Sequence, residues 1–459
     1  MEKSTNDSVF STDKEVRNKT LDFFPKDHPQ GFVVCLSESG EAACIPHDRE
    51  ERNENVAIFG ASGSGKTFAF TKPNLLACID QGFSAIVNDL GGELFRKTFK
   101  LALEKGAEVR VLNLDPSKSR PCDGWNIIGS LVKMGPDDPR ANGYIRNITE
   151  TILENSHGDG EYFKLMEERL LEFLIRYVAF SEHFTGEKKD RTFERCCGIL
   201  SSMIDKSWSC NFISDLFEKS PDDPAANAWN AFMEYNEKQK ENAMASLSEK
   251  LRIFRTDYVN EIISGDSIDL SLPGRKQCIY YVISSFQDNG FVPLTSLFFS
   301  CAIKELTEEA GNHPNGKLGV PVMFILDEFV TIGKICGFPL ILNNIHKYGI
   351  SIAIVFHDIR QLERIYPGES LSIVAGCDTR IAFQINEKKT MDVIAARLMQ
   401  ENSISSFDAE KLLHKILRLL MEGKVMVSTR GCKIYKANKY GYVHHYLSSY
   451  VNNPENHKD

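Results

Sequence analysis

The sequence lacks the apolar segments that would place it in a membrane or direct it to the secretory pathway. Its 459 residues contain no apolar run near the roughly 18 residues that cross a bilayer. The first 20 residues are polar and hold no apolar core of a signal peptide. We therefore expect a water-soluble chain.

The cysteines lack the patterns of a metal site or a disulfide framework. The chain has 12 cysteines and no C-x-x-C pair, which argues against the usual zinc motifs. Most lie in apolar runs, as Cys35 and Cys278 do. Such cysteines are typical of small buried residues in a reducing compartment.

An excess of positive charge is also lacking, since the formal net charge is -9. Proteins that bind nucleic acid broadly are usually basic, so any DNA contact here is expected to be local, at a loop or a pore lining. The sequence shows no internal repeat and no low-complexity tract. Its length and 42% hydrophobic content suit more than one domain.

A glycine-rich loop of the pattern G-x-x-x-x-G-K-[ST] is the clearest motif present. It comprises Gly60, Ala61, Ser62, Gly63, Ser64, Gly65, Lys66 and Thr67. An apolar run that predicts a strand precedes it and a helical segment follows, which argues against an accidental Lys-Thr in a turn. The N–H groups of such a loop, the Lys66 ammonium and the Thr67 hydroxyl predict binding of ATP phosphates and Mg²⁺.

A pair of carboxylates is the second nucleotide-binding signal. Asp327 and Glu328 follow an apolar run at 322–326, so a buried strand would deliver them to the edge of a sheet. Asp327 is predicted to hold Mg²⁺ through water, and Glu328 to orient the water that attacks the γ-phosphate. The alternative for Glu328 is a solvated acid at a helix start.

Two further polar residues end predicted strands. His357 follows the run 350–356 and is predicted to contact the γ-phosphate or the attacking water, although a strand-end histidine with a purely structural hydrogen bond is the alternative. Asp89 faces the nucleotide or caps the next helix, and we favour the cap.

Hydrolysis also needs a cation, which ring ATPases often supply as an arginine from the next subunit. Arg380 is our first candidate, ahead of Arg360 and Arg364.

Strands and helices alternate on both sides of a helical stretch, which predicts an α/β fold with a largely parallel sheet and an inserted all-α domain. After a hairpin at 31–45, strands are expected at 56–59, 84–87, 108–114, 278–283, 322–326, 350–356, 380–383 and, as the last strand, 424–427. Pro73 is predicted to end or kink the helix that follows the glycine-rich loop.

The expected domains are a polar, flexible lead-in (1–28), the first part of a nucleotide-binding domain (29–135), an all-α domain (136–269), the second part of the nucleotide-binding domain (270–450) and a tail (451–459).

Stretches along most of the chain, in a fixed order, carry a resemblance to one family. They are residues 55–67 with 72–76, residues 89–94 (similar to D-P-K-G-E-L), Trp125-Asn126 (N-P-L), residues 324–329 with 332–333 (I-L-D-E-F…I-G), residues 361–363 with Tyr366 (Q-L-…-Y-G), and residues 376–379 with Thr390. Over residues 30–445 the chain thereby resembles the type IV coupling proteins, the TraG/TraD-like ATPases of conjugation and type IV secretion.

The resemblance implies a RecA-like nucleotide-binding domain and Mg²⁺-dependent ATP hydrolysis in a ring, typically a hexamer, through which DNA passes. It implies a protein that links a relaxase–DNA complex, or protein substrates, to the type IV secretion channel. It also implies a cytoplasmic location at the inner face of the cell membrane, with a membrane-protein partner supplying the anchor.

The chain departs from the family pattern at several places. Leu90 and Gly91 replace its Pro and Lys, and His357 replaces a sensor-like Gln. The transmembrane helices with which most members begin are not seen, so a soluble form is expected. Two other functions stay open: a nucleotide-switched substrate receptor with little turnover, and a DNA translocase of the segregation or packaging type. We expect no dedicated DNA-guiding domain after Tyr446, which argues against the translocase.

Overall fold

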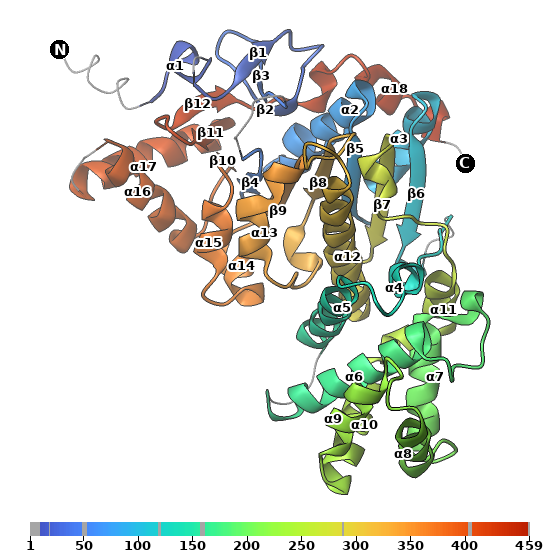
Figure 1. The fold of residues 1–459 in the computed structure, drawn as a ribbon. Coiled ribbons are helices and arrows are strands. Elements are labelled where there is room, and N and C mark those ends of the chain that lie inside the picture. The colour runs from blue at the N-terminus through green and yellow to red at the C-terminus, as the bar shows by residue number, and fades with distance from the viewer. Residues whose placement is uncertain are drawn as a thin grey trace, which may run out of the picture.

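The computed structural model describes residues 10–17, 19–47, 53–117, 121–156, 161–286, 289–402 and 406–457 (Figure 1). Its strands are β1 (Asp22–Phe24), β2 (Phe32–Leu36), β3 (Ala42–Ile45), β4 (Val56–Phe59), β5 (Ser84–Leu90), β6 (Glu108–Asn113), β7 (Cys278–Ser284), β8 (Val322–Leu326), β9 (Ile350–Phe356), β10 (Thr379–Ala382), β11 (Lys424–Thr429) and β12 (Tyr435–Asn438). They form one 12-stranded sheet in the order β1-β3-β2-β12-β11-β10-β4-β9-β8-β5-β7-β6.

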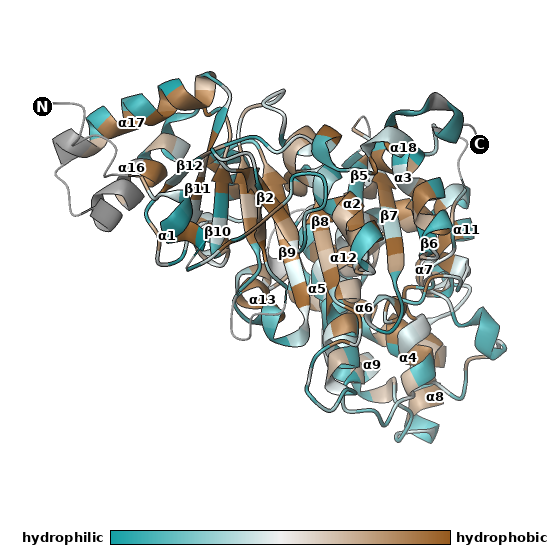
Figure 2. Ribbon diagram, turned by 90° about the horizontal axis from the view of Figure 1, so that it is seen from above, coloured by the Kyte–Doolittle hydropathy of each residue, from teal (hydrophilic) through white to brown (hydrophobic). Residues whose placement is uncertain are grey.

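The sheet has a parallel part and an antiparallel part. From β10 through β4, β9, β8, β5 and β7 to β6, all neighbours are parallel. From β10 through β11, β12, β2 and β3 to β1, all neighbours are antiparallel. The central strands are hydrophobic along their length (Figure 2), as a parallel sheet covered on both faces requires. The predicted α/β class with a largely parallel sheet is confirmed.

Helices lie on both faces of the sheet. The helices of the described residues are α1 (Asp13–Arg17), α2 (Lys72–Gln81), α3 (Glu93–Glu104), α4 (Gly129–Met134), α5 (Ala141–Asn155), α6 (Glu161–Phe180), α7 (Phe193–Ile204), α8 (Cys210–Lys219), α9 (Ala226–Met233), α10 (Glu237–Lys250), α11 (Asp257–Ser264), α12 (Val292–Gly311), α13 (Phe338–Asn344), α14 (Ile359–Ile365), α15 (Ser370–Ala375), α16 (Lys388–Asn402), α17 (Ser406–Met421) and α18 (Ser448–Asn452). Helices α2 and α3 lie on one face, and α5 and α12 lie on the other. Across the described ranges, no helix combines the length and apolar character needed to cross a membrane.

The two faces of the sheet contribute to separate hydrophobic clusters. On β5, Ala85 and Val87 pack in the cluster with α2 and α3, whereas Ile86 packs in the cluster with α5 and α12. This alternation is the period of two that a strand imposes on its side chains.

Between β6 and β7 the described residues form helices and no strand, as the sequence predicts. Helix α5 packs on α12 beside the sheet, while α6 packs with α7, α9 and α10. In Figure 1, α6 to α11 form a group beyond the end of the sheet. The domain bounds given above stay a prediction.

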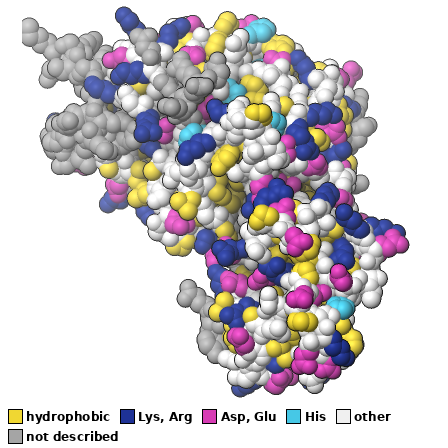
Figure 3. Space-filling model, viewed as in Figure 1, with side chains coloured by type: hydrophobic (Ala, Val, Ile, Leu, Met, Phe, Trp, Pro, Cys, Tyr) yellow, Lys and Arg dark blue, Asp and Glu magenta, His cyan; other side chains and the backbone are white. Residues whose placement is uncertain are grey.

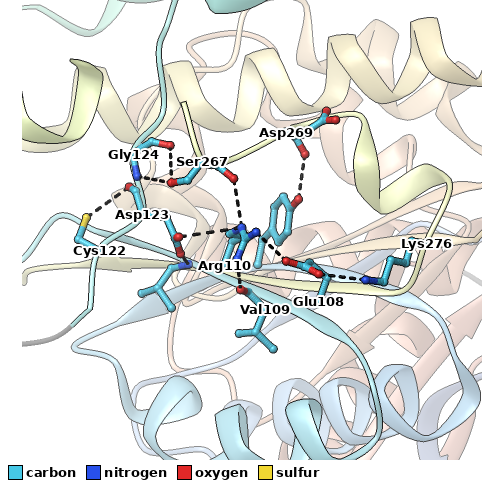
Figure 4. Close-up of polar contacts among 11 residues, drawn as sticks. Glu108, Val109, Arg110, Cys122, Asp123, Gly124, Ser267, Asp269 and Lys276 are labelled. Atoms are coloured by element: carbon cyan, nitrogen blue, oxygen red, sulfur yellow. Dashed lines mark hydrogen bonds and ion pairs between the residues drawn. The ribbon is translucent and has the colours of Figure 1, made fainter. Parts of the chain in front are cut away.

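Polar contacts join the two chain segments that lead into and out of this helical stretch (Figure 4). Arg110 on β6 donates from Nε to the carbonyl oxygen of Ser267 at 3.1 Å and pairs with Glu108 at 2.6 Å. Glu108 also pairs with Lys276 at 3.0 Å, and the Gly124 N–H donates to the Ser267 hydroxyl at 2.8 Å. Both segments are therefore tied to the outermost parallel strand.

The predicted flexible lead-in is wrong for the described part of residues 10–28. Val16 and Leu21 are fully buried, and β1 pairs with β3. These few apolar side chains lie in a polar stretch whose sequence pattern does not reveal them. The prediction that 424–427 is the last strand is also wrong, because β12 follows and pairs with β11.

The helix after the glycine-rich loop does not end at Pro73. Residues Thr67–Thr71 form a π-helical turn, η1, and α2 continues from Lys72. Pro73 lies in the first turn of α2, a position that tolerates its missing N–H. The helix therefore changes type before the proline instead of stopping there.

Candidate nucleotide-binding site

The glycine-rich loop connects β4 to η1 at the carboxyl edge of the parallel strands. Gly63 and Gly65 have φ of +74° and +91°, conformations that favour glycine. A Cβ on Gly60 would lie 2.6 Å from the Cβ of Phe383, so this position has no room for a side chain. The Ala61 N–H donates to the Gln384 carbonyl at 2.7 Å, which fixes the loop against the residues after β10. The predicted strand, loop and helix are thus confirmed.

Lys66 lies inside the loop. Its Nζ donates to the carbonyl oxygens of Gly60 at 2.7 Å and Ala61 at 3.2 Å, and lies 3.0 Å from Nδ1 of His357. Burial lowers the pKa of Lys66, against the opposing effect of two nearby carboxylates. The ammonium is therefore directed to the centre of the loop, where bound phosphate groups would lie.

Thr67 and Asp327 are brought together as the sequence predicts. The Thr67 hydroxyl donates to Oδ2 of Asp327 at 2.9 Å. Burial raises the pKa of Asp327 to about 6, and the neighbouring Glu328 acts in the same direction. A hydroxyl and a buried carboxylate are ligands that suit Mg²⁺, which completes its coordination with water and phosphate. Within the described ranges there is no group of three or more His, Cys, Asp or Glu that could hold a metal alone, so phosphate ligands would be needed here.

Glu328 is held in a left-handed conformation with φ of +50°, which is unusual for a residue with a side chain. Its Oε2 lies 3.1 Å from Nε2 of His357. Since an ammonium group can only donate, Lys66 donates to Nδ1 of His357, and the ring of a neutral His357 then donates from Nε2 to Glu328. His357 thus bridges the lysine of the loop and the carboxylate after β8.

Asp89 accepts hydrogen bonds from the N–H groups of Leu94 at 3.1 Å and Phe95 at 2.8 Å, in the first turn of α3. The predicted capping role of this carboxylate is confirmed.

Arg380 lies on β10 and donates to the carbonyl oxygens of Val374 at 2.9 Å and Ala375 at 3.3 Å, at the end of α15. Arg360 on α14 pairs with Glu387 at 2.7 Å. Within one chain these arginines stabilise local structure. A contribution of Arg380 to the site of a neighbouring subunit stays a prediction.

Two residues of the site were missed by the sequence reasoning. Lys439 follows β12 and donates from Nζ to the carbonyl oxygen of Ser64 at 2.8 Å, across a sequence separation of 375 residues. Asn88 on β5 donates to the backbone oxygen of Asp327 at 2.6 Å. Neither residue belongs to a recognisable motif, so only the fold could identify them.

Comparison with known proteins agrees with this fold. Residues 18–410 match the family described as Type IV secretory system Conjugative DNA transfer. Conjugal transfer protein TraG of Escherichia coli is 20% identical over 361 residues, which cover 75% of this chain and 55% of that protein. The chain thus spans about half the length of this relative.

Two solved structures of the plasmid coupling protein TrwB share the fold. The complex with the non-hydrolysable ATP analogue ADPNP has a TM-score of 0.62 at 13% identity and covers 94% of this chain and 92% of that one. The complex with ADP and Mg²⁺ has a TM-score of 0.58 at 12% identity, with 94% and 92% covered. Together with the family match over most of the chain, this RecA-like fold shows that the chain belongs to the type IV coupling protein family of conjugative DNA transfer.

Proposed function

We propose that this chain is a Mg²⁺-dependent ATPase that helps to move conjugative DNA, carried as a relaxase–DNA complex, or protein substrates to a type IV secretion channel. One observation carries the proposal: two sets of contacting side chains lie together at one edge of the sheet. Thr67 contacts Asp327, and His357 contacts both Lys66 and Glu328. The TrwB structures named with ADPNP and with ADP and Mg²⁺ support the choice of cofactors.

In this mechanism the N–H groups of the loop and Lys66 bind the phosphates, and Thr67 and Asp327 hold Mg²⁺, which would neutralise charge on the transferred group. Glu328 orients the attacking water and accepts its proton. Neutral His357 donates to Glu328 and so fixes the direction of that carboxylate.

The proposed partners are DNA, the relaxase complex and components of the secretion channel. We further propose that the chain works as a homo-oligomeric ring, with Arg380 contributed to the neighbouring site, at the inner face of the cell membrane beside a membrane-protein partner that supplies the anchor. The TraG relative, named for conjugal transfer, and the coupling protein TrwB support this assignment.

A nucleotide-switched receptor with little turnover is the second candidate. The observation in its favour is the Glu328–His357 contact at 3.1 Å, which engages the carboxylate that must act on water. In the receptor, this contact would persist while nucleotide is bound.

Steady-state ATP hydrolysis by the full chain, with and without single- and double-stranded DNA and at several protein concentrations, tests the proposal. We expect DNA-stimulated turnover that rises faster than linearly with protein concentration. Glu328→Gln should lower turnover about 100-fold or more while ATP binding persists. The matched control is Glu249→Gln, an exposed carboxylate on α10 that should change neither quantity. ATP binding without turnover under all conditions would favour the receptor and reject the motor.

A further inference from the structure

The order of the strands indicates on which side of the loop the γ-phosphate and the base of a bound nucleotide would lie. The loop follows β4, and the residues expected to act on the γ-phosphate, Glu328 and His357, follow β8 and β9 on one side of it. The other side of β4 is formed by β10, β11 and β12. If the γ-phosphate points toward β9, the ribose and base must leave the loop toward β10 and β12.

The chain segment after β12 covers this side of the loop. Lys439 donates to the Ser64 carbonyl at 2.8 Å, and its Nζ lies 5.7 Å from the centre of the Phe383 ring. Lys439 is half-buried, and this burial lowers the pKa of its ammonium group. A positive charge thus lies outside the loop, on the side where the ribose and the α-phosphate would emerge.

Tyr442, three residues after Lys439, forms an aromatic contact with Phe68, the residue that follows the loop. The Tyr442 ring packs edge-on against Phe68, with 5.2 Å between ring centres, and Lys72 lies 5.3 Å from the centre of the Tyr442 ring. The Tyr442 hydroxyl donates to Oδ1 of Asn452 at 2.6 Å, which fixes the ring. A Cβ on Gly441 would lie 2.4 Å from Phe68, so glycine allows this close approach.

Phe68 itself is the residue directly after Thr67, and it is 41% exposed although it is supported on one side by Gly441 and Tyr442. We propose that Phe68 and Lys439 form the subsite for the base and ribose of a purine nucleotide, with Gly441 and Tyr442 as its support. Aromatic and cationic contacts hold a base by its face, so this subsite would not separate adenine from guanine.

This inference rests on the proposed nucleotide-binding function. Two ligands, one with a base and one without, allow the base subsite and phosphate binding to be tested separately. Calorimetric titration of the full chain with Mg²⁺–ADP and with Mg²⁺–tripolyphosphate compares a ligand that has a base with one that lacks it. Phe68→Ala should weaken ADP binding about fivefold or more and leave tripolyphosphate binding within about twofold. Phe68→Tyr should retain ADP binding, and Lys439→Met should weaken it.

The matched control is Phe212→Ala, because Phe212 is an exposed aromatic residue on α8 with 55% exposure. It should alter neither affinity. If Phe68→Ala weakens both ligands equally, or weakens neither, the base subsite is overturned while nucleotide binding stands. If the wild-type chain binds neither ligand, the proposed function fails together with the subsite.

Discussion

The ring of His357 lies between Lys66 and Glu328 and contacts both, so the three residues form one chain of polar contacts. When the ring is neutral and accepts from Lys66 at Nδ1, its proton lies on Nε2 and faces Glu328. Lys66 could be predicted from the glycine-rich loop motif, and Glu328 and His357 from their positions after predicted strands. Their contact could not, because it depends on β9 lying between β4 and β8.

Removing the ammonium of the loop tests its role directly. Lys66→Ala should lower ATP affinity about tenfold or more, because a charge-assisted contact to phosphate is lost. Fluorescence titration with a labelled ATP analogue measures this effect. Lys347→Ala, at an exposed lysine far from the loop in sequence, serves as the control. An unchanged affinity in Lys66→Ala would reject the assignment of the phosphate site.

Glu305 on α12 lines a cavity of about 300 Å³ beside α4, together with Ser130, whose hydroxyl donates to it at 2.6 Å. Burial raises the pKa of Glu305 to about 7. The folded chain therefore keeps a proton that the unfolded chain releases near pH 4.5. The stabilisation from this proton is complete below that pH and is lost as the pH rises through about 7.

Glu305→Gln should remove this pH dependence, because the amide stays neutral. Thermal unfolding of both proteins from pH 5 to pH 8 should show the variant gaining stability relative to the wild type as the pH rises. A difference in Tm that is constant across this range would contradict the raised pKa of Glu305.

At the scale of elements, α6 and α10 are joined by a buried ion pair. Lys250 lies 2.6 Å from Oε2 of Glu167, and the two side chains are 8% and 0% exposed. The other oxygen, Oε1 of Glu167, is buried with no hydrogen-bond partner. Breaking such a pair leaves a buried charge uncompensated, whereas removing both charges does not.

Lys250→Met should destabilise the helical part by about 3–5 kcal/mol, and Glu167→Leu combined with Lys250→Met should recover most of this loss. Urea denaturation followed by circular dichroism compares the variants. The exposed pair of Arg252 and Glu249 provides the control, since Arg252→Met should change stability by less than about 1 kcal/mol. A double variant no more stable than Lys250→Met alone would show that the charge is not the cause.

The buried parallel strands were predictable because each is a continuous apolar run that ends in polar residues, as β8 and β9 are. The helical stretch was predictable from its apolar periodicity. Strand β12 was not, since it is short and alternates buried residues with Lys436 and Asn438. Its place is determined by pairing with β11, which a turn separates from it, and with β2, which is distant in sequence.

At the scale of the whole molecule, the chain carries a formal net charge of -9. On the face shown in Figure 3, basic and acidic side chains are interspersed over the described residues. A distribution of this kind suits the expectation that DNA contact is local. The α/β class followed from the alternation of elements, whereas the sheet order required the structure, because β4 is paired on both sides with strands from the second half of the chain.

This placement of β4 has a consequence for synthesis on the ribosome. His357, at the end of the neighbouring strand β9, follows Lys66 by 291 residues. At about 5–20 residues per second, translation leaves β4 without its partners for about 15–60 s. During that interval an apolar strand and an incomplete phosphate loop are exposed to the cytosol. The nascent chain is therefore most vulnerable to aggregation before the candidate site is assembled, and most dependent then on chaperones that cover unpaired strands.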